Sequence, residues 1–270
     1  MQTIYAMSDI HGMLRPFRKR LEQLNMDDIR SGNAKVILLG DYIDRGINSL
    51  GVLETAYNLQ KDLGDNLIVL MGNHDKWFLN FLRGEDPHWL GNYQSTAFVS
   101  QFMSDDGMGR VNHLIARGKA YLASDIIRKA FEAYNKDLLS WMKGLPLFHE
   151  TEHQIYVHAG VDEEAEDWWA VGTSDEMFIE KYPPSTGYFY KDIIAGHVST
   201  STASNNRSNH DIYYDGESHI FIDGVDSYPH TAKEDDCIIP LLQYTEKNGI
   251  GYYYSIDLSD HKTLICKKEW

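Results

Sequence analysis

The sequence has few cysteines and no long hydrophobic stretch. Its 270 residues include only two cysteines, Cys237 and Cys266, too few for a disulfide framework or a cysteine-based zinc cluster. No apolar run approaches the roughly 20 residues of a membrane-spanning helix. The first residues also lack the basic start and apolar stretch of a signal peptide. We therefore expect a cytoplasmic protein that associates with no membrane.

Positive charge is also scarce. The chain has 25 Lys and Arg against 40 Asp and Glu, a formal net charge of -15 at pH 7. This excess of negative charge argues against nucleic acid as a partner. A hydrophobic content of 43% is enough for a buried core. Because no internal repeat, low-complexity tract or obvious linker divides the chain, we expect one domain spanning residues 1–270. The oligomeric state stays open.

Five short apolar runs predict buried strands of an α/β protein. They are Thr3–Met7, Val36–Leu39, Leu67–Met71, Gln154–Val157 and Ile193–Ala195. Each run is followed at once by residues of metal-ligand type, in chain order Asp9 with His11, Asp41, Asn73, His158 and His197. Open α/β sheets hold ligands at the carboxyl ends of their strands, so these side chains should converge on one site. Ordinary core histidines would explain one or two such endings, but not five.

The predicted ligands are oxygen and imidazole groups without thiolate, a set that suits Mn²⁺, Fe or Zn²⁺. Two ions that share a carboxylate can clamp an in-line displacement and generate hydroxide near neutral pH. We expect two divalent metal ions, with manganese as the first choice and iron or zinc as the alternatives.

Other patterns place the remaining elements. Apolar residues at helical spacing predict helices over residues 13–24 and after Gly46, the second with Asn48 or Ser49 as its N-cap. Residues 76–150 are typical of a helical insertion, with Ser124-Asp125 as a cap. The C-terminal part is β-rich, with strands expected at Cys237–Tyr244 and Gly251–Ile256 and a hairpin turn at Lys247-Asn248-Gly249.

The motifs at the strand ends resemble those of the calcineurin-like metallophosphoesterases. The matching segments are Asp9-Ile-His11-Gly12, Gly40-Asp41-Tyr-Ile-Asp44-Arg45-Gly46, Gly72-Asn73-His74-Asp75, His158-Ala-Gly160 and Gly196-His197. The Asp-Arg-Gly ending and the spacing look like the phosphoprotein phosphatase branch, especially its bacterial and phage members. The resemblance implies a four-layer α/β sandwich of two mixed β-sheets flanked by helices.

The resemblance also implies a role for each matching residue. The metal ligands would be Asp9, His11, Asp41, Asn73, His158 and His197, with Asp41 bridging the two ions. A hydroxide that bridges the ions would attack phosphorus. The leaving oxygen would take its proton from His74, which Asp44 would orient. Arg45 would clamp phosphate oxygens, as its planar guanidinium suits.

The chain departs mildly from the family pattern at Asp75, which stands where the family has glutamate and lies outside the set of metal ligands. The family also usually carries a second phosphate-binding arginine between the last two histidine motifs, but no arginine occurs from residue 129 to residue 206. The segment that looks equivalent runs from Met177 to Lys181 and places a carboxylate, Glu180, there. The candidates to replace the missing arginine are Lys181, Lys191 and Arg207.

The resemblance implies a dinuclear-metal phosphomonoesterase, and a protein serine/threonine phosphatase is our first choice. One alternative is the hydrolysis of a dinucleoside polyphosphate such as diadenosine tetraphosphate. Another is a regulator that binds metal and phosphate with weakened catalysis. The intact His74–Asp44 pair argues against the regulator, because a binding protein needs no proton donor. The expected partner is a phosphoprotein or a small phosphoester.

Overall fold

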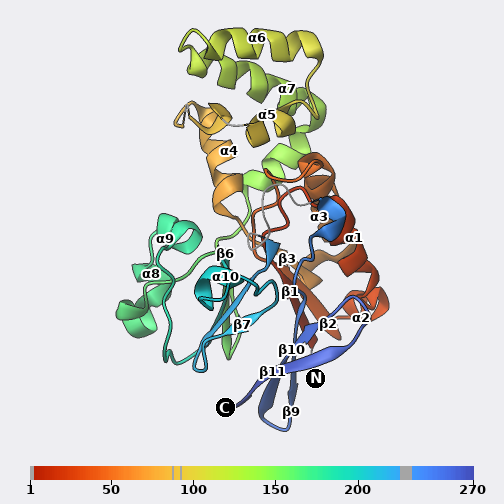
Figure 1. The fold of residues 1–270 in the computed structure, drawn as a ribbon, viewed down its shortest axis with the longest axis vertical. Helices are drawn as coiled ribbons and strands as arrows, with labels where there is room; N and C mark the ends of the chain where they lie inside the picture. Colours follow the sequence, from red (N-terminus) through yellow and green to blue (C-terminus); the bar gives the residue numbers. More distant parts are fainter. Residues whose placement is uncertain (1–2, 87, 92, 226–232) are drawn as a thin grey trace.

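The computed structural model describes residues 3–86, 88–91, 93–225 and 233–270, in which two mixed β-sheets are flanked by helices (Figure 1). The first sheet has the order β11-β10-β9-β1-β2-β3 and the second β4-β5-β6-β8-β7. The first contains β1 (Thr3–Met7), β2 (Ala34–Leu38), β3 (Leu67–Val69), β9 (Leu242–Lys247), β10 (Ile250–Ile256) and β11 (Lys262–Glu269). The second contains β4 (Phe148–Glu150), β5 (Gln154–Val157), β6 (Asp192–Ser199), β7 (Tyr213–Tyr214) and β8 (His219–Asp223).

Strand β2 is apolar at consecutive positions because both of its faces are buried. The strand pairs in parallel with β1 on one side and β3 on the other. Val36 and Leu38 belong to the core that faces the helices. Ile37 and Leu39 belong to a second core, shared with Ile194 of β6, that lies between the sheets. Because both faces are covered, no position in this run is left for a polar residue.

The helices cover the outer faces of the sheets and form a lobe above them (Figure 1). They are α1 (Leu14–Glu22), α2 (Met26–Arg30), α3 (Ser49–Leu63), α4 (Asn73–Arg83), α5 (Tyr93–Val99), α6 (Asp105–Ile115), α7 (Ala120–Lys143), α8 (Trp169–Gly172), α9 (Asp175–Glu180) and α10 (Thr200–Ala203). The lobe, α4 to α7, lies in sequence between β3 and β4. Its buried residues, among them Phe78, Phe98 and Phe131, belong to the same hydrophobic core as β2.

Helix ends follow local hydrogen-bonding groups. Asn48 caps α3, because its side chain accepts a hydrogen bond from Gly51 N at 3.0 Å. The predicted cap at Ser124-Asp125 is wrong. Helix α7 already begins at Ala120, and the Ser124 hydroxyl donates back to the Tyr121 carbonyl inside the helix. A serine bonded in this way looks the same in the sequence as a serine at a helix start.

The C-terminal strands join the first sheet and make it mixed, since β9 pairs antiparallel with β1. The β9–β10 turn has left-handed backbone at both Asn248 (φ 54°) and Gly249 (φ 73°), as a tight hairpin requires. Strand β9 begins at Leu242 and not at Cys237, five residues later than predicted. The residues from Cys237 to Leu241 are not part of the strand, and they include Pro240, which has no backbone N–H to donate to a sheet.

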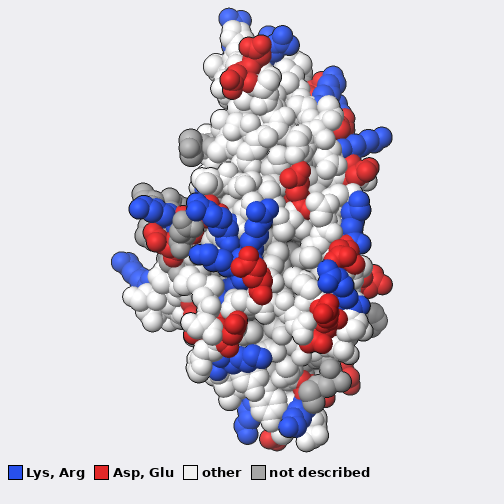
Figure 2. All heavy atoms as spheres, turned by 90° about the vertical axis from the view of Figure 1, so that its right-hand side faces the viewer, with Lys and Arg blue, Asp and Glu red and all other residues white. Residues whose placement is uncertain are grey.

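The described residues confirm the predicted α/β fold of two mixed sheets flanked by helices, and the assignment of one domain stays a prediction. No helix in the described part of the chain is both long and apolar enough to cross a membrane. Figure 2 shows the face that lies at the right of Figure 1. Acidic and basic side chains are interspersed there, so the net negative charge does not form a single acidic surface on this face.

Candidate active site

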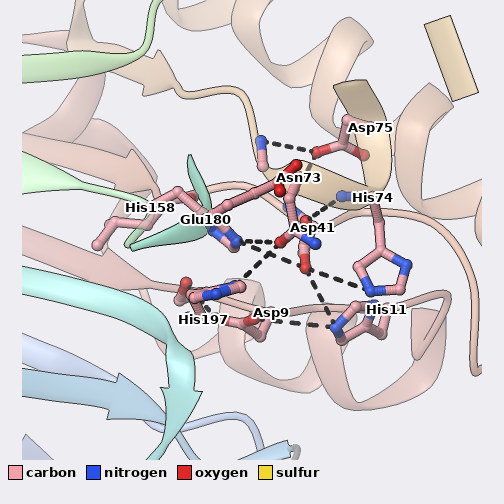
Figure 3. A network of polar contacts seen from close by, with 12 residues as sticks. Asp9, His11, Asp41, Asn73, His74, Asp75, His158, Glu180 and His197 are labelled. Atoms are coloured by element: carbon pink, nitrogen blue, oxygen red, sulfur yellow. Dashed lines mark hydrogen bonds and ion pairs between the residues drawn. The ribbon is translucent and has the colours of Figure 1, made fainter. Parts of the chain in front are cut away.

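Loops from both sheets meet at one place, where Figure 3 shows the predicted ligands side by side. Asp9 and His11 follow β1, and Asp41 follows β2. Asn73 is the first residue of α4, just after β3. His158 follows β5, and His197 lies within β6. The carboxyl ends of parallel strands therefore converge as predicted, although the strands belong to two different sheets.

The backbone at this site is held in a conformation that most residues avoid. Six site residues have positive φ: Asp9 (52°), His11 (44°), Asp41 (58°), Asp44 (68°), Arg45 (59°) and His197 (60°). A left-handed conformation costs a non-glycine residue about 1–2 kcal/mol. Its clustering here indicates that the loops are shaped to aim side chains and not to minimise local strain.

Two glycines allow the loops to approach each other. A methyl group added at Gly196 would overlap the Ser8 hydroxyl and the Asp9 carboxylate. One added at Gly72 would overlap the backbone N and the carboxylate of Asp41. The glycines of these two motifs are therefore required for packing, because only a hydrogen fits between the neighbouring loops.

Asp41 is at the centre of the cluster. Its Oδ2 lies 3.5 Å from His11 Nε2, 3.5 Å from His158 Nε2 and 4.0 Å from His74 Nε2. Among the residues that the structure describes, two groups of side chains have ligand atoms close enough together to hold one cation each. They are His11, Asp41 and His74, and Asp9, Asp41 and His158. Asp41 belongs to both, as expected of a bridging ligand.

The surroundings of His11 fit a cation. Burial, and then the nearby charges of Arg45 and His74, hold the pKa of His11 well below 6.5, so its ring is neutral. Its Nδ1–H donates to the Ile43 carbonyl at 2.8 Å. The Nε2 lone pair therefore faces the carboxylates of Asp9 (3.8 Å) and Asp41 (3.5 Å). Lone pairs that face one another repel unless a cation lies between them, and a carbonyl on the second ring nitrogen is the usual support of a metal-bound histidine.

His158 of the second group repeats this pattern, and the predicted ligands Asn73 and His197 lie beside it. His158 donates from Nδ1 to the Leu39 carbonyl at 2.8 Å, and burial holds its pKa well below 6.5. The Asn73 amide oxygen lies 2.9 Å from His158 Nε2 and 3.0 Å from His197 Nδ1. Burial, the His74 ring and the Arg45 charge lower the pKa of His197 to about 4. Neutral imidazoles around oxygen donors are the ligand chemistry of a hard or intermediate divalent metal.

His74 differs from His11 and His158 because its Nδ1 is hydrogen-bonded to a carboxylate and not to a backbone carbonyl. Its Nδ1 donates to Asp44 Oδ2 at 2.7 Å, and Asp44 is almost fully buried. Its Nε2 points toward the Asp41 carboxylate (Figure 3). An imidazole whose Nδ1–H is held by a buried carboxylate presents its Nε2 in a fixed direction, as a proton donor requires. The geometry also admits His74 as a metal ligand, and its role stays a prediction.

Sequence reasoning missed the importance of Asp75, which it treated as a mild departure. Its Oδ2 accepts hydrogen bonds from Asp41 N (2.9 Å) and Gly72 N (3.1 Å), and its Oδ1 accepts one from Tyr42 N (3.1 Å). Asp75 therefore joins the loop after β2 to the start of α4. Burial raises the pKa of this carboxyl to about 6. Its position three residues into the helix, typical of a capping box, was the available signal.

Two of the three candidates for the missing arginine are engaged elsewhere. Lys181 Nζ donates to the Val161 carbonyl (2.6 Å) and to Glu163 (2.9 Å). Lys191 donates to Glu150 (2.9 Å) and to the Thr151 carbonyl (2.7 Å), at the strand ends opposite the site. The third candidate, Arg207, is exposed in the segment after α10. Arg45 is left as the cation whose charge acts on the site histidines.

The model of the calcineurin-like phosphoesterase family matches residues 2–218. The chain belongs to this family. Members are metal-dependent phosphoesterases, and the predicted family is confirmed. The candidate ligand groups suit the divalent metal ions that the family uses.

Curated relatives share part of the chain. A symmetrical bis(5'-nucleosyl)-tetraphosphatase of Nitrosospira multiformis is 29% identical over 160 residues, which is 58% of this chain and 43% of the relative. That of Glaesserella parasuis is 28% identical over 194 residues, 71% of this chain and 55% of the relative. The alignments thus span about half the length of these relatives.

A solved structure supports the fold over nearly the whole chain. The cold-active protein-tyrosine phosphatase of a psychrophilic Shewanella species matches with a TM-score of 0.58 and 16% identity, covering 98% of this chain and 81% of its own. At this level of identity the similarity concerns the fold alone.

Proposed function

We propose that this protein hydrolyses dinucleoside tetraphosphates and releases nucleoside diphosphates. The observation that supports phosphoester hydrolysis is the His74–Asp44 pair, 2.7 Å apart, beside the cluster centred on Asp41. The substrate class rests on the names of the curated relatives. They favour the alternative from the sequence over our first choice, a protein phosphatase.

The site residues have distinct tasks in this proposal. The metal ligands would be Asp9, His11, Asp41, Asn73, His158 and His197. When bound, the ions lower the pKa of water and screen the negative charge of the phosphate oxygens. Arg45 adds a fixed positive charge that holds the phosphate chain, and its guanidinium can bind two oxygens at once. These roles are assigned residue by residue from the motifs.

His74 acts on the leaving group. While protonated on both nitrogens, it keeps Nδ1–H on Asp44 and gives the Nε2 proton to the oxygen that leaves phosphorus. The Asp44 carboxylate fixes the direction of the ring during this transfer. The neutral ring that results keeps its Nδ1–H on Asp44 and can take up another proton from solvent.

Phosphoprotein hydrolysis is the second candidate, and the same pair of residues favours it. A serine alkoxide is a far more basic leaving group than a nucleoside diphosphate. A positioned proton donor therefore accelerates the departure of serine more. An intact His74–Asp44 pair is thus most useful for a phosphoserine substrate.

A substrate panel tests the proposal. The Mn²⁺-loaded protein is assayed with diadenosine tetraphosphate, a phosphoserine peptide and an aryl phosphate, with the Asp41→Asn variant as a control for contaminating activity. We expect the highest kcat/KM on the tetraphosphate, with ADP as the product. A higher value on the peptide would establish the second candidate. A protein that binds Mn²⁺ but turns over none of the three would be a regulator.

A further inference from the structure

Glu180 brings a carboxylate to the edge of the site from an element far away in sequence. Its Oε1 accepts a hydrogen bond from Trp77 Nε1 at 2.6 Å. Trp77 lies three residues after His74 on α4, on the same side of the helix, and the two rings are 4.7 Å apart between centroids. Figure 3 shows Glu180 reaching toward the group of side chains around Asp41. His74, Trp77 and Glu180 therefore form a continuous row.

Two contacts join α9 to α4, one at each end of α9. Trp77 holds the Glu180 carboxylate, and Lys76 lies 3.9 Å from Asp175 at the other end of α9. The next residue, Lys181, is bound to Glu163 and the Val161 carbonyl, so its positive charge is paired away from Glu180. This wall of the site therefore presents negative charge, in the segment where the family usually has an arginine.

A carboxylate at this place is unsuited to phosphate and well suited to hydroxyl groups. It repels phosphate oxygens, but as an acceptor with about four lone-pair positions it can take O–H donors in addition to the indole N–H. Glu180 is exposed and can be reached by a substrate. The neutral part of a nucleotide that offers two adjacent O–H donors is the ribose diol, and carboxylates bind this diol in other nucleotide sites.

The proposed function places the leaving group beside this row. In that proposal His74 gives its proton to the leaving oxygen, so the leaving group would lie next to His74. Trp77 and then Glu180 come next in the row. We propose that Trp77 and Glu180 form the nucleoside site of the leaving nucleoside diphosphate, where Glu180 accepts hydrogen bonds from the ribose diol and the indole borders the sugar. This inference rests on the proposed function for the identity of the leaving group.

The test measures how ADP and 2',3'-dideoxy-ADP inhibit aryl phosphate hydrolysis by the Mn²⁺-loaded protein. The variant is Glu180→Gln, because glutamine still accepts the indole N–H while replacing the second acceptor with an N–H donor. Glu176→Gln, an exposed residue of the same helix, is the matched control. Loss of a hydrogen bond to a charged group corresponds to roughly tenfold or more in affinity.

We expect wild type and Glu176→Gln to bind ADP about tenfold more tightly than dideoxy-ADP, and Glu180→Gln to lose most of that preference. Calorimetric titration should show the same difference, with ADP bound more weakly by Glu180→Gln than by wild type and Glu176→Gln. An equal preference in wild type and Glu180→Gln would overturn the inference. So would tighter binding of both nucleotides by Glu180→Gln, because the carboxylate would then only repel negative charge. Diadenosine tetraphosphate is not used here, so failure of the proposed function would appear separately, in the substrate panel.

Discussion

Asp75 offers the sharpest test of how the site is held together. Its carboxylate accepts three backbone N–H groups, two from the loop after β2 and one from the residue before α4. In Asp75→Asn one oxygen remains an acceptor and the other becomes an NH₂ group that faces an N–H donor. At least one charge-assisted hydrogen bond is lost, which costs about 1.5–3 kcal/mol. Burial, which raises the pKa of the carboxyl to about 6, already opposes the charge and offsets part of this loss.

We therefore expect Asp75→Asn to lower the free energy of unfolding by about 2 kcal/mol. Asp75→Glu, the residue usual in the family, should lose less because it keeps both acceptors. Urea denaturation at pH 7.5, with and without Mn²⁺, measures the stability. Titration with Mn²⁺ should also show weaker binding by Asp75→Asn, since Asp75 holds the backbone of Asp41. Asp137→Asn, at an exposed position of α7, is the control. If Asp75→Asn matched this control in both measurements, Asp75 would not join the loops.

Other predictions concern the metal, the phosphate, the proton and the acid limit of stability. Asp41→Asn should lose bound metal and nearly all activity, and two ions retained by elemental analysis would exclude bridging. Arg45→Ala should reduce kcat/KM roughly tenfold or more, while an unchanged value would place the phosphate clamp elsewhere. His74→Asn should keep its metals, and its rate of hydrolysis should fall about 10²–10⁴-fold on a phosphoserine peptide but distinctly less on an aryl phosphate. Asp44→Asn should show the same difference between the two substrates, with smaller losses. Loss of metal from His74→Asn would make His74 a ligand. Burial alone would raise the pKa of Glu163, but hydrogen bonds from His219 and Lys181 lower it to about 2. The free energy of unfolding of Glu163→Gln should therefore be about 2 kcal/mol lower than that of wild type at pH 7, after a discount for partial exposure. This difference should disappear as the pH falls from about 4.5 toward 2, because Glu163 is then protonated in the folded protein too. A difference that does not change with pH would contradict the ion pairs.

The sequence predicted the features that depend on local pattern. The β2 run is apolar because both its faces are buried, and the residues after it lie at the strand end, so Asp41 could be placed without knowing the partner strands. The turn at Asn248-Gly249 was also predictable from the local sequence, because these two residues adopt left-handed backbone without contacts from distant segments.

Contacts between distant segments could not be predicted in this way. Trp77 and Glu180 are 103 positions apart, and nothing near either residue indicates that they meet. The charge of Lys181 could be counted from the sequence, but its pairing with Glu163 depends on how α9 packs beside the loop after β5. For that reason a lysine that looked available for phosphate is already bound.

The left-handed backbone of the site has a consequence for how this protein can change. Six residues at about 1–2 kcal/mol each hold strain comparable to the whole stability of an ordinary domain. Glycine at any of them would relieve the strain but remove a side chain that the proposed chemistry uses. Selection for heat resistance alone would therefore be expected to erode this corner of the molecule first, and to trade its activity for durability. In the loops around Asp41, the residues that carry the local strain are the same residues that the proposed chemistry needs.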